Sequence, residues 1–323
     1  MASAGRRVLR RLTAPVARAA ALAVTLALAG CYDTSVSPER LPRFVQPTGP
    51  APRVALVLGS GGPRGFAHIG VLKALDEAGI KPDLIVGSSV GAMVGALYCS
   101  GISGAQLEKM AYEIRMIEFF EFGMLAGKPS SGVGVQRYVD SKLHGRALEQ
   151  LKTAMVAIAT RLSDNQLVMF NHGDAGLAVR ASSADPGQFE PVKIGGDTYV
   201  DGDEMSPVPI RVARKLGARV VIAVDVSAYA ADTPAGVPQA WIDKDARRAK
   251  QVAAEAPYAD VLIHPNIGYY AGESEAYRRR VIGTAEEVAR KEIDKIRTAL
   301  QKAGVDAPQT ASMARSPAGD ASR

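Results

Sequence analysis

The feature that most restricts the possible folds is a unit that occurs twice: an apolar run, a glycine-rich turn and a helix. The run 54–58 is followed by "GSGGPRG" and the run 84–86 by "GSSVG", and helical spacing of apolar residues follows each turn. Unbroken apolar runs are typical of strands covered on both faces, as in parallel sheets. Further runs expected to form strands lie at 155–159, 167–170, 220–226 and 261–263. This alternation predicts an α/β fold with a mostly parallel sheet flanked by helices.

A long amphipathic helix is expected to close the domain, because apolar side chains recur at helical spacing between Tyr277 and Leu300. Residues 32–52 are rich in Pro, Ser and Thr and lack periodicity, which is typical of a tether. Residues 304–323 have a similar composition and are expected to be disordered.

The first thirty residues predict export. They combine several arginines and no acidic residue with an apolar run at 19–29. A basic head before a short apolar run has the shape of a secretory signal and is too short for an ordinary transmembrane helix. The run ends in "LAGC", which resembles the bacterial lipobox, so Cys31 is predicted to be lipidated and to begin the mature protein. A plain signal peptide with an incidental cysteine is the alternative.

Cleavage of this segment would change the charge and the cysteine content of the protein. The formal net charge of +6 falls to +1 when the five arginines of residues 1–30 are removed. The basic character therefore gives no support to nucleic-acid binding, and we expect no nucleic-acid partner. If Cys31 is acylated, Cys99 has no partner for an internal disulfide, and its place after an apolar helix predicts a small buried residue.

The second glycine-rich turn contains a candidate nucleophile. Gly87-Ser88-Ser89-Val90-Gly91 fits the pattern G-x-S-x-G. The pattern alone is weak, but here it lies directly between a predicted strand and a predicted helix, where a strained turn exposes the serine hydroxyl. The glycines would leave room for so tight a turn. The helix amino terminus favours developing negative charge. An ordinary helix N-cap is the alternative role for Ser89.

The first glycine-rich turn does not fit a nucleotide-binding loop. A dinucleotide fingerprint that starts at Gly59 would need glycine where Arg64 stands, and no acidic residue ends the next strand. The Gly-Lys-Ser/Thr of a Walker A loop is also absent from the sequence. The consecutive N–H groups of Gly61 and Gly62 remain, and such groups can converge on an oxyanion.

Four blocks resemble the signature blocks of the patatin-like phospholipases: "GSGGPRGFAHIGVLKAL", "GSSVGAMVGALY", "RASSADPGQFEPV" and "YVDGDEMSPVPI". They occur in the family's order and cover roughly 53–216. The resemblance implies a three-layer α/β/α fold and a serine–aspartate dyad in place of a triad. It implies Ser89 as nucleophile, Asp201 as base, and Gly61 and Gly62 as oxyanion donors. The supporting motif residues that it implies are Gly59, Arg64 (as a structural residue), Gly65, Gly87, Gly91 and Gly202.

The identity of the base is a choice between a carboxylate and a histidine. The only credible triad histidine is His264, oriented by Asp225, in the chain order of α/β-hydrolases. The other histidines are expected in packed or surface positions: His68, His144 and His172. We prefer Asp201, which must be partly buried, because a carboxylate near its ordinary pKa of about 3.9 accepts a serine proton poorly. No clustered spacing of metal ligands occurs in the sequence, and no metal or cofactor is expected.

Asp203 departs from the family pattern, which usually has glycine or alanine two residues after the catalytic aspartate. Its charge could raise the proton affinity of Asp201, or it could face solvent, or it could impair the site. Aspartate tolerates left-handed backbone better than most residues, so we expect activity to be retained.

Two segments bear on substrate and membrane. The cluster 117–127, "IEFFEFGMLAG", is expected to be core, with a mobile apolar lip as the alternative. Trp241 lies in a proline-rich segment and could touch a bilayer surface.

The sequence therefore predicts a serine-dependent acyl hydrolase that acts on phospholipids or lysophospholipids. Lipidated Cys31 would anchor it to the cell envelope, with the outer membrane preferred to the inner membrane, and the domain would lie in the periplasm or at the cell surface. The alternative is a catalytically silent lipoprotein that binds lipid or a partner. The expected organisation is a signal peptide, a lipidated tether, a patatin-like domain and a disordered tail, at 1–30, 31–52, 53–303 and 304–323.

Overall fold

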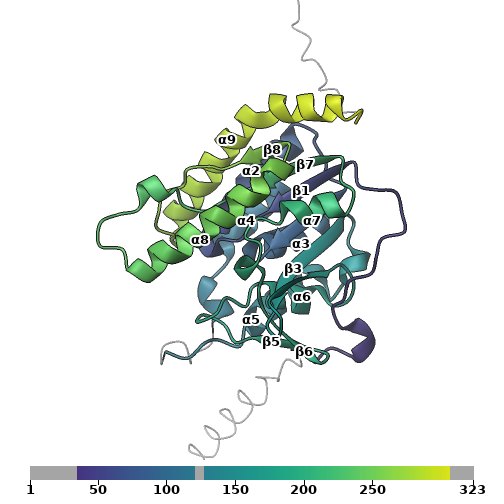
Figure 1. The fold of residues 1–323 in the computed structure, drawn as a ribbon, viewed down its shortest axis with the longest axis vertical. Coiled ribbons are helices and arrows are strands. Elements are labelled where there is room, and N and C mark those ends of the chain that lie inside the picture. The colour runs from purple at the N-terminus through teal and green to yellow at the C-terminus, as the bar shows by residue number, and fades with distance from the viewer. Residues whose placement is uncertain (1–34, 121–126, 306–323) are drawn as a thin grey trace, which may run out of the picture. The chain divides into compact units, whose positions relative to one another are not determined.

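The computed structural model describes residues 35–120 and 127–305 (Figure 1). The predicted signal peptide, Cys31 and nearly all of the predicted tail lie outside the described residues. Phe122, Met124 and Leu125 of the apolar cluster also lie outside them. Within the described parts of the chain, no helix combines the length and the apolar character that crossing a membrane requires.

The centre of the domain is an eight-stranded sheet with the order β5-β6-β3-β2-β1-β7-β8, in which β4 pairs with β3 off this path. The pairs along β3-β2-β1-β7-β8 are parallel, whereas β4 and β6 run antiparallel to β3, and β5 to β6. The strands are β1 (Val54–Leu58), β2 (Leu84–Ser88), β3 (Ala154–Arg161), β4 (Gln166–Phe170), β5 (Val192–Ile194), β6 (Asp197–Asp201), β7 (Val220–Val224) and β8 (Val261–Ile263). The mostly parallel sheet is confirmed.

Helices cover both faces of the sheet (Figure 1). Along β1, Val54, Leu56 and Leu58 belong to one core, which α2, α3 and α9 share, while Ala55 and Val57 belong to the other, which α7 and Val252 of α8 share. This alternation is the reason why the strands read as unbroken apolar runs. The helices are α2 (Phe66–Glu77), α3 (Val90–Cys99), α4 (Gly104–Glu113), α5 (Val133–Leu143), α6 (Ala175–Ser182), α7 (Ile210–Lys215), α8 (Gln239–Glu255) and α9 (Glu275–Lys302).

Short 3-10 turns connect several of these elements: η1 (Pro38–Arg40), η2 (Gly62–Gly65), η3 (Met116–Phe119), η5 (Leu148–Gln150), η6 (Gly202–Glu204), η7 (Ala230–Asp232) and η8 (Ala256–Tyr258). Cys99 is buried at the end of α3, as its sequence context indicated. The local structure at Trp241 differs from the proline-rich segment that was predicted. The prolines precede α8, and Trp241 lies in the first turn of that helix. Pro238 at the N-cap is compatible with a helix start, where no backbone N–H is required.

The register on β3 brings two distant parts of the chain together. Ser88 at the end of β2 lies opposite Ile158, and Asp201 at the end of β6 lies opposite Ala159. Since β4 pairs with residues 157–161 on the other edge of β3, β2 and β6 occupy the same edge, one after the other. The residue after Ser88 therefore meets the end of β6.

Candidate active site

Ser89 occupies a strained turn between β2 and α3. Its φ of 54° and ψ of −123° are rarely adopted by residues with a side chain. The glycines on either side are required by close approach: a Cβ at Gly87 would lie 2.5 Å from Cα of Ala92, and one at Gly91 only 2.1 Å from the carbonyl oxygen of Leu58. The turn presents the Ser89 hydroxyl at the carboxyl end of the parallel strands.

The Ser89 hydroxyl donates a hydrogen bond to Oδ2 of Asp201 at 2.7 Å. Ser89 is the N-cap residue of α3 by position, yet its side chain makes no capping hydrogen bond. Its backbone N–H instead donates to the hydroxyl of buried Ser182, the last residue of α6, at 2.9 Å. Ser182 was missed in the sequence analysis, although it lies within the third signature block.

Asp201 is buried and held on several sides. Its Oδ1 accepts from the Asp203 N–H at 2.8 Å, and its carbonyl oxygen accepts from the Thr160 hydroxyl at 2.9 Å. Gly202 leaves no room for a side chain, because a Cβ there would lie 2.8 Å from Cγ1 of Ile158. Burial, and secondarily the negative charge of Asp203, raise the pKa of the Asp201 carboxyl well above its ordinary value. The burial that was expected of a carboxylate base is present at Asp201.

Asp203 forms an ion pair with Arg248 of α8 and accepts a hydrogen bond from the Ser60 hydroxyl. Arg248 is buried and also donates to the Ser60 carbonyl oxygen at 2.6 Å and to the Ser60 hydroxyl at 2.7 Å. Asp203 therefore neither faces solvent nor stands uncompensated beside Asp201. Sequence reasoning missed Arg248, which is 45 residues from Asp203 and matches no motif.

The first glycine-rich loop lies beside the same site. The N–H of Ser60 donates to the Pro207 carbonyl oxygen at 2.8 Å. Within the described residues, in contrast, the N–H groups of Gly61 and Gly62 donate to no group of the chain. Gly62 has a φ of +54°, and a Cβ at Gly61 would lie 2.7 Å from Cγ2 of Val226. Two adjacent N–H donors thus remain available in the cavity that Ser89 lines.

The remaining motif residues of this loop support it by packing and hydrogen bonding. Arg64 donates from Nη2 to the Tyr269 carbonyl oxygen at 2.5 Å, which is a structural contact. A Cβ at Gly65 would lie 2.3 Å from Cγ2 of Val90, so the loop packs directly on the start of α3. A Cβ at Gly59 would lie 2.9 Å from Cγ2 of Val208.

The structure does not bring an imidazole to Ser89. Nε2 of His264 lies 3.0 Å from the Ser227 carbonyl oxygen and 3.7 Å from Oδ2 of Asp225, and its ring stacks on Tyr229. His264 does not line the cavity that contains Ser89 and Asp201. His68 is packed, with Nε2 2.7 Å from the Gly59 carbonyl oxygen, and burial lowers its pKa to about 4. The triad alternative therefore lacks its geometry.

A cavity of about 1020 Å³ opens beside the dyad. Phe119 is buried and packs edge-on against Tyr138, and Phe120 stacks on Phe189. These side chains also line the cavity, so Phe119 and Phe120 belong both to the core and to the cavity wall, whereas Ile117 of the same cluster is exposed. Most of the wall is apolar and is formed by Met93, Leu97, Leu107, Met110, Ile114, Phe119, Phe120, Val135 and Phe189. The cavity suits a long apolar group attached to a carbonyl.

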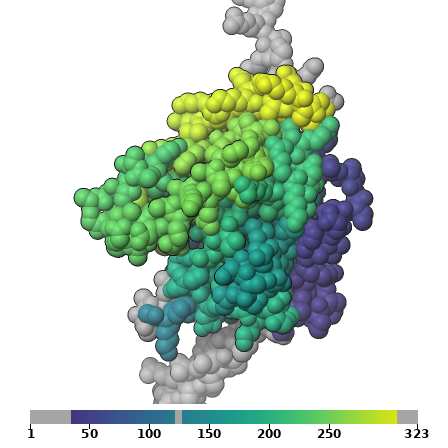
Figure 2. Space-filling view, in the orientation of Figure 1, coloured from purple at the N-terminus to yellow at the C-terminus, as the bar shows by residue number. Residues whose placement is uncertain are grey.

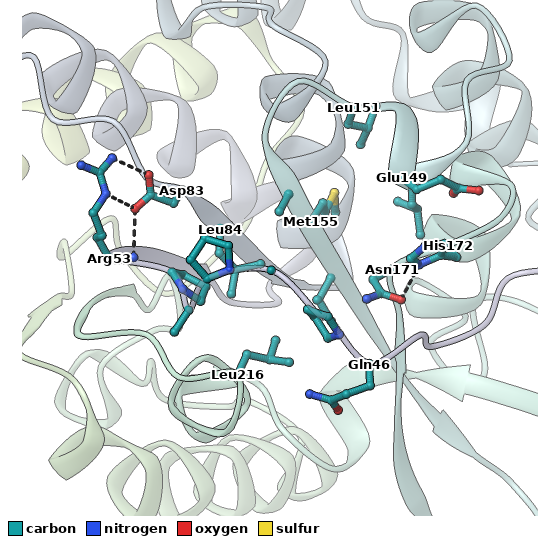
Figure 3. Close-up of a pocket in the computed structure, with 18 residues that line it drawn as sticks. Gln46, Arg53, Asp83, Leu84, Glu149, Leu151, Met155, Asn171, His172 and Leu216 are labelled. Carbon is teal, nitrogen blue, oxygen red and sulfur yellow. Dashed lines mark hydrogen bonds and ion pairs between the residues drawn. The ribbon is translucent and has the colours of Figure 1, made fainter.

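A second cavity, of about 610 Å³, lies at the opposite end of the strands (Figure 3). It is bounded by the segment 46–53 and by Leu84 and Ala154, the first residues of β2 and β3. The Arg53–Asp83 ion pair closes one side of it. None of the predicted site residues lines this cavity.

The sequence profile of the patatin-like phospholipases matches residues 56–214, a range that contains Ser89, Asp201 and the glycine loop. The chain belongs to the patatin-like phospholipase family.

The alignments with relatives cover only part of the length of each relative. An uncharacterized NTE family protein of Mycobacterium tuberculosis is 34% identical over 207 residues, 61% of this chain and 56% of that protein. Lysophospholipase NTE1 of Coccidioides immitis is 34% identical over 189 residues, 57% of this chain and 12% of that protein. Patatin-like phospholipase domain-containing protein 6 of Homo sapiens is 33% identical over 181 residues, 54% of this chain and 13% of that protein. The chain thus spans about half the length of the mycobacterial relative and far less of the other two.

The fold of the patatin-like domain agrees with a solved structure. VipD from Legionella pneumophila superposes with a TM-score of 0.54 at 13% identity, covering 83% of this chain and 72% of that chain. At this identity the likeness shows a shared three-layer fold.

Proposed function

We propose that the domain is a serine-dependent hydrolase of lipid acyl esters, of the phospholipase A or lysophospholipase type. The observation that carries the proposal is the hydrogen bond from the Ser89 hydroxyl to Asp201 at 2.7 Å, at the wall of a largely apolar cavity. The name of the fungal relative, a lysophospholipase, supports the choice of ester. No metal or cofactor takes part in the proposed reaction.

The proposed reaction has two steps. Ser89 Oγ attacks the ester carbonyl carbon while its proton passes to Asp201, and the N–H groups of Gly61 and Gly62 hold the oxyanion. The carbon–oxygen bond of the ester then breaks, and the leaving alcohol takes the proton from Asp201. In the second step water gives a proton to Asp201 and attacks the acyl group. Release of the fatty acid returns that proton to Ser89. Burial of Asp201 favours the two transfers in which Asp201 accepts a proton, from Ser89 and from water, because it raises the proton affinity of the carboxylate.

The amino end of α3 also stabilises the negative charge of the oxyanion. Ser89 immediately precedes α3, so the partial positive charge of the helix terminus lies next to the carbon that Ser89 attacks. The best support for the silent-lipoprotein alternative was Asp203, and the ion pair of Asp203 with Arg248 weakens that support.

A fluorophosphonate probe tests the proposed function. Labelling of the folded chain should disappear in Ser89→Ala and should slow by about 100-fold or more in Asp201→Asn, which loses the proton acceptor. His264→Ala is the matched control and should label at the wild-type rate. A folded chain that does not label would favour the silent lipoprotein. Loss of labelling in His264→Ala, with Asp201→Asn unaffected, would overturn the dyad.

The envelope location is proposed from residues 1–31 alone. Lipidation of Cys31 would hold the domain close to its lipid substrate and raise the local concentration of both. In a bacterial host that receives labelled palmitate, the full chain should carry the label and Cys31→Ser should not. Cys99→Ser is the control, since Cys99 is buried. Export and cleavage of the wild-type chain without label would leave a plain signal peptide.

A further inference from the structure

The large apolar side chains that are most exposed gather at one place. Among the described residues, the three highest exposed fractions of such side chains are 60% for Ile117, 59% for Tyr270 and 55% for Trp241. All three line the cavity that contains Ser89. The less exposed ones lie elsewhere, beginning with Leu162 at 50%. We call Ile117, Trp241 and Tyr270 the apolar rim.

The apolar rim is assembled from three segments that are far apart in the sequence. Ile117 lies in η3, Trp241 in the first turn of α8, and Tyr270 in the connection between β8 and α9. The part of the surface formed by α8 is green in Figure 2. Folding alone does not require three such side chains to remain exposed around one opening, and grouped exposed apolar residues are typical of an interaction site.

Cationic side chains accompany the apolar rim. Lys244 and Arg247 of α8 line the same cavity. Lys244 pairs with Asp185 at 3.0 Å, whereas Arg247 is exposed and forms no ion pair with any described residue. Five acidic residues also line the cavity: Asp185, Asp201, Asp203, Asp245 and Glu273. Asp185 and Asp203 are paired with Lys244 and Arg248, and Asp245 accepts from the Tyr269 hydroxyl at 2.9 Å. Trp and Tyr beside Arg and Lys are the side chains that favour the headgroup level of a bilayer.

We propose that the apolar rim docks on the surface of a phospholipid bilayer, with the cavity mouth facing the membrane. An acyl chain could then pass from the bilayer into an apolar cavity without crossing water. A protein seated on the apolar rim would close that path, so a lipid surface is the occupant that the cavity favours. The use of the cavity rests on the proposed function, whereas docking itself requires no catalysis.

Trp241 is a natural reporter of this contact, because it is the only tryptophan of the chain. The full chain carrying Ser89→Ala is mixed with vesicles of phosphatidylcholine, or of phosphatidylcholine and phosphatidylglycerol, so that the lipid is not consumed. We expect the Trp241 emission to shift to the blue and to be quenched by brominated lipid. Emission that is unchanged with both vesicles would overturn the proposal. Binding through residues 1–31 alone would leave Trp241 in water.

Variants of the apolar rim distinguish specific docking from nonspecific adsorption to lipid. Ile117→Ser and Tyr270→Ser should each raise the lipid concentration needed for half of the Trp241 shift by about fivefold to tenfold. Leu162→Ser is the matched control, because Leu162 is similarly exposed but lies outside the cavity, and it should bind like the parent. Arg247→Gln should remove most of the extra affinity for phosphatidylglycerol. Equal weakening by Leu162→Ser would contradict a specific rim.

Turnover of a water-soluble short-chain ester by the wild-type chain is measured beside these titrations. Ester turnover without a Trp241 shift would overturn docking and leave the proposed function standing. A Trp241 shift without ester turnover would overturn the proposed function and leave docking standing.

Discussion

At the scale of single residues, the site depends on the different surroundings of two neighbouring carboxylates, those of Asp201 and Asp203. Asp201 is buried and hydrogen-bonded to the Ser89 hydroxyl, while Asp203, two residues later, forms an ion pair with Arg248. The Asp203–Arg248 pair also holds Ser60, the residue before the two candidate oxyanion donors. One ion pair therefore connects the loop of the candidate base to the loop of the candidate oxyanion donors.

This connection predicts a strong coupling between Arg248 and Asp203. Both side chains are nearly buried, so Arg248→Met should lower the free energy of unfolding by about 3–5 kcal/mol, since it leaves Asp203 unpaired. Arg248→Met/Asp203→Ala should be less destabilised than the sum of the single changes, by about 1–3 kcal/mol. Denaturant unfolding of the four proteins measures this coupling. Additive effects would mean that the pair contributes no interaction of its own.

The raised pKa of Asp201 predicts a pH-dependent stability of the opposite sign to most aspartates. Because the folded state binds the Asp201 proton more tightly than the unfolded chain, stability is lost as pH rises from about 4 through the raised pKa. Asp201→Asn removes this pH-dependent loss of stability. The variant should therefore be more stable than the wild type near neutral pH, and the difference should shrink toward pH 4. Denaturant midpoints across this range measure it. A wild type that is the more stable protein at neutral pH would contradict the raised pKa.

At the scale of elements, the sequence predicted the parallel strands and the two glycine turns, because buried runs and glycines depend on local sequence. It did not predict β6, whose five residues include two aspartates and whose pairing is set by β3. It also did not predict α8, of which only Arg248 and Val252 are buried, so its apolar periodicity is weak. The G-x-S-x-G turn made Ser89 a candidate nucleophile, and the family resemblance favoured that role over an N-cap and assigned Asp201. Arg248 and Ser182 act through contacts that only the folded chain creates.

The crossing of α3 over β1 predicts opposite effects for two helical glycines. Gly91→Ala places a methyl group 2.1 Å from the carbonyl oxygen of Leu58, and a strand backbone cannot move away without breaking its pairing. We expect a loss of several kcal/mol of unfolding free energy, or no folded protein. Gly283→Ala in α9 is the control, since open space surrounds that position and alanine favours helix by about 0.5–1 kcal/mol. Thermal unfolding compares the two, and a stable Gly91→Ala would contradict the close approach.

At the scale of the whole domain, two cavities with different linings lie at opposite ends of the parallel strands. The carboxyl ends of the parallel strands carry Ser89 and the larger cavity, whereas the amino ends carry the smaller one, which holds no candidate catalytic residue. Ligands of open α/β sheets bind at the carboxyl ends of the strands, where loops diverge. Because the larger cavity is mostly apolar, its length rather than a polar contact should select the acyl chain.

Chain-length selectivity is therefore predicted to follow the cavity wall. Each methylene group buried there contributes about 0.8 kcal/mol, so kcat/KM for p-nitrophenyl esters from butyrate to palmitate should rise by up to about fourfold per methylene until the cavity is filled. Met110→Trp narrows the wall and should move the optimum to a shorter chain with little change for butyrate. Leu162→Trp, outside the cavity, should leave the profile unchanged. A profile that is flat in the wild type, or that shifts equally in both variants, would show that the cavity does not hold the acyl chain.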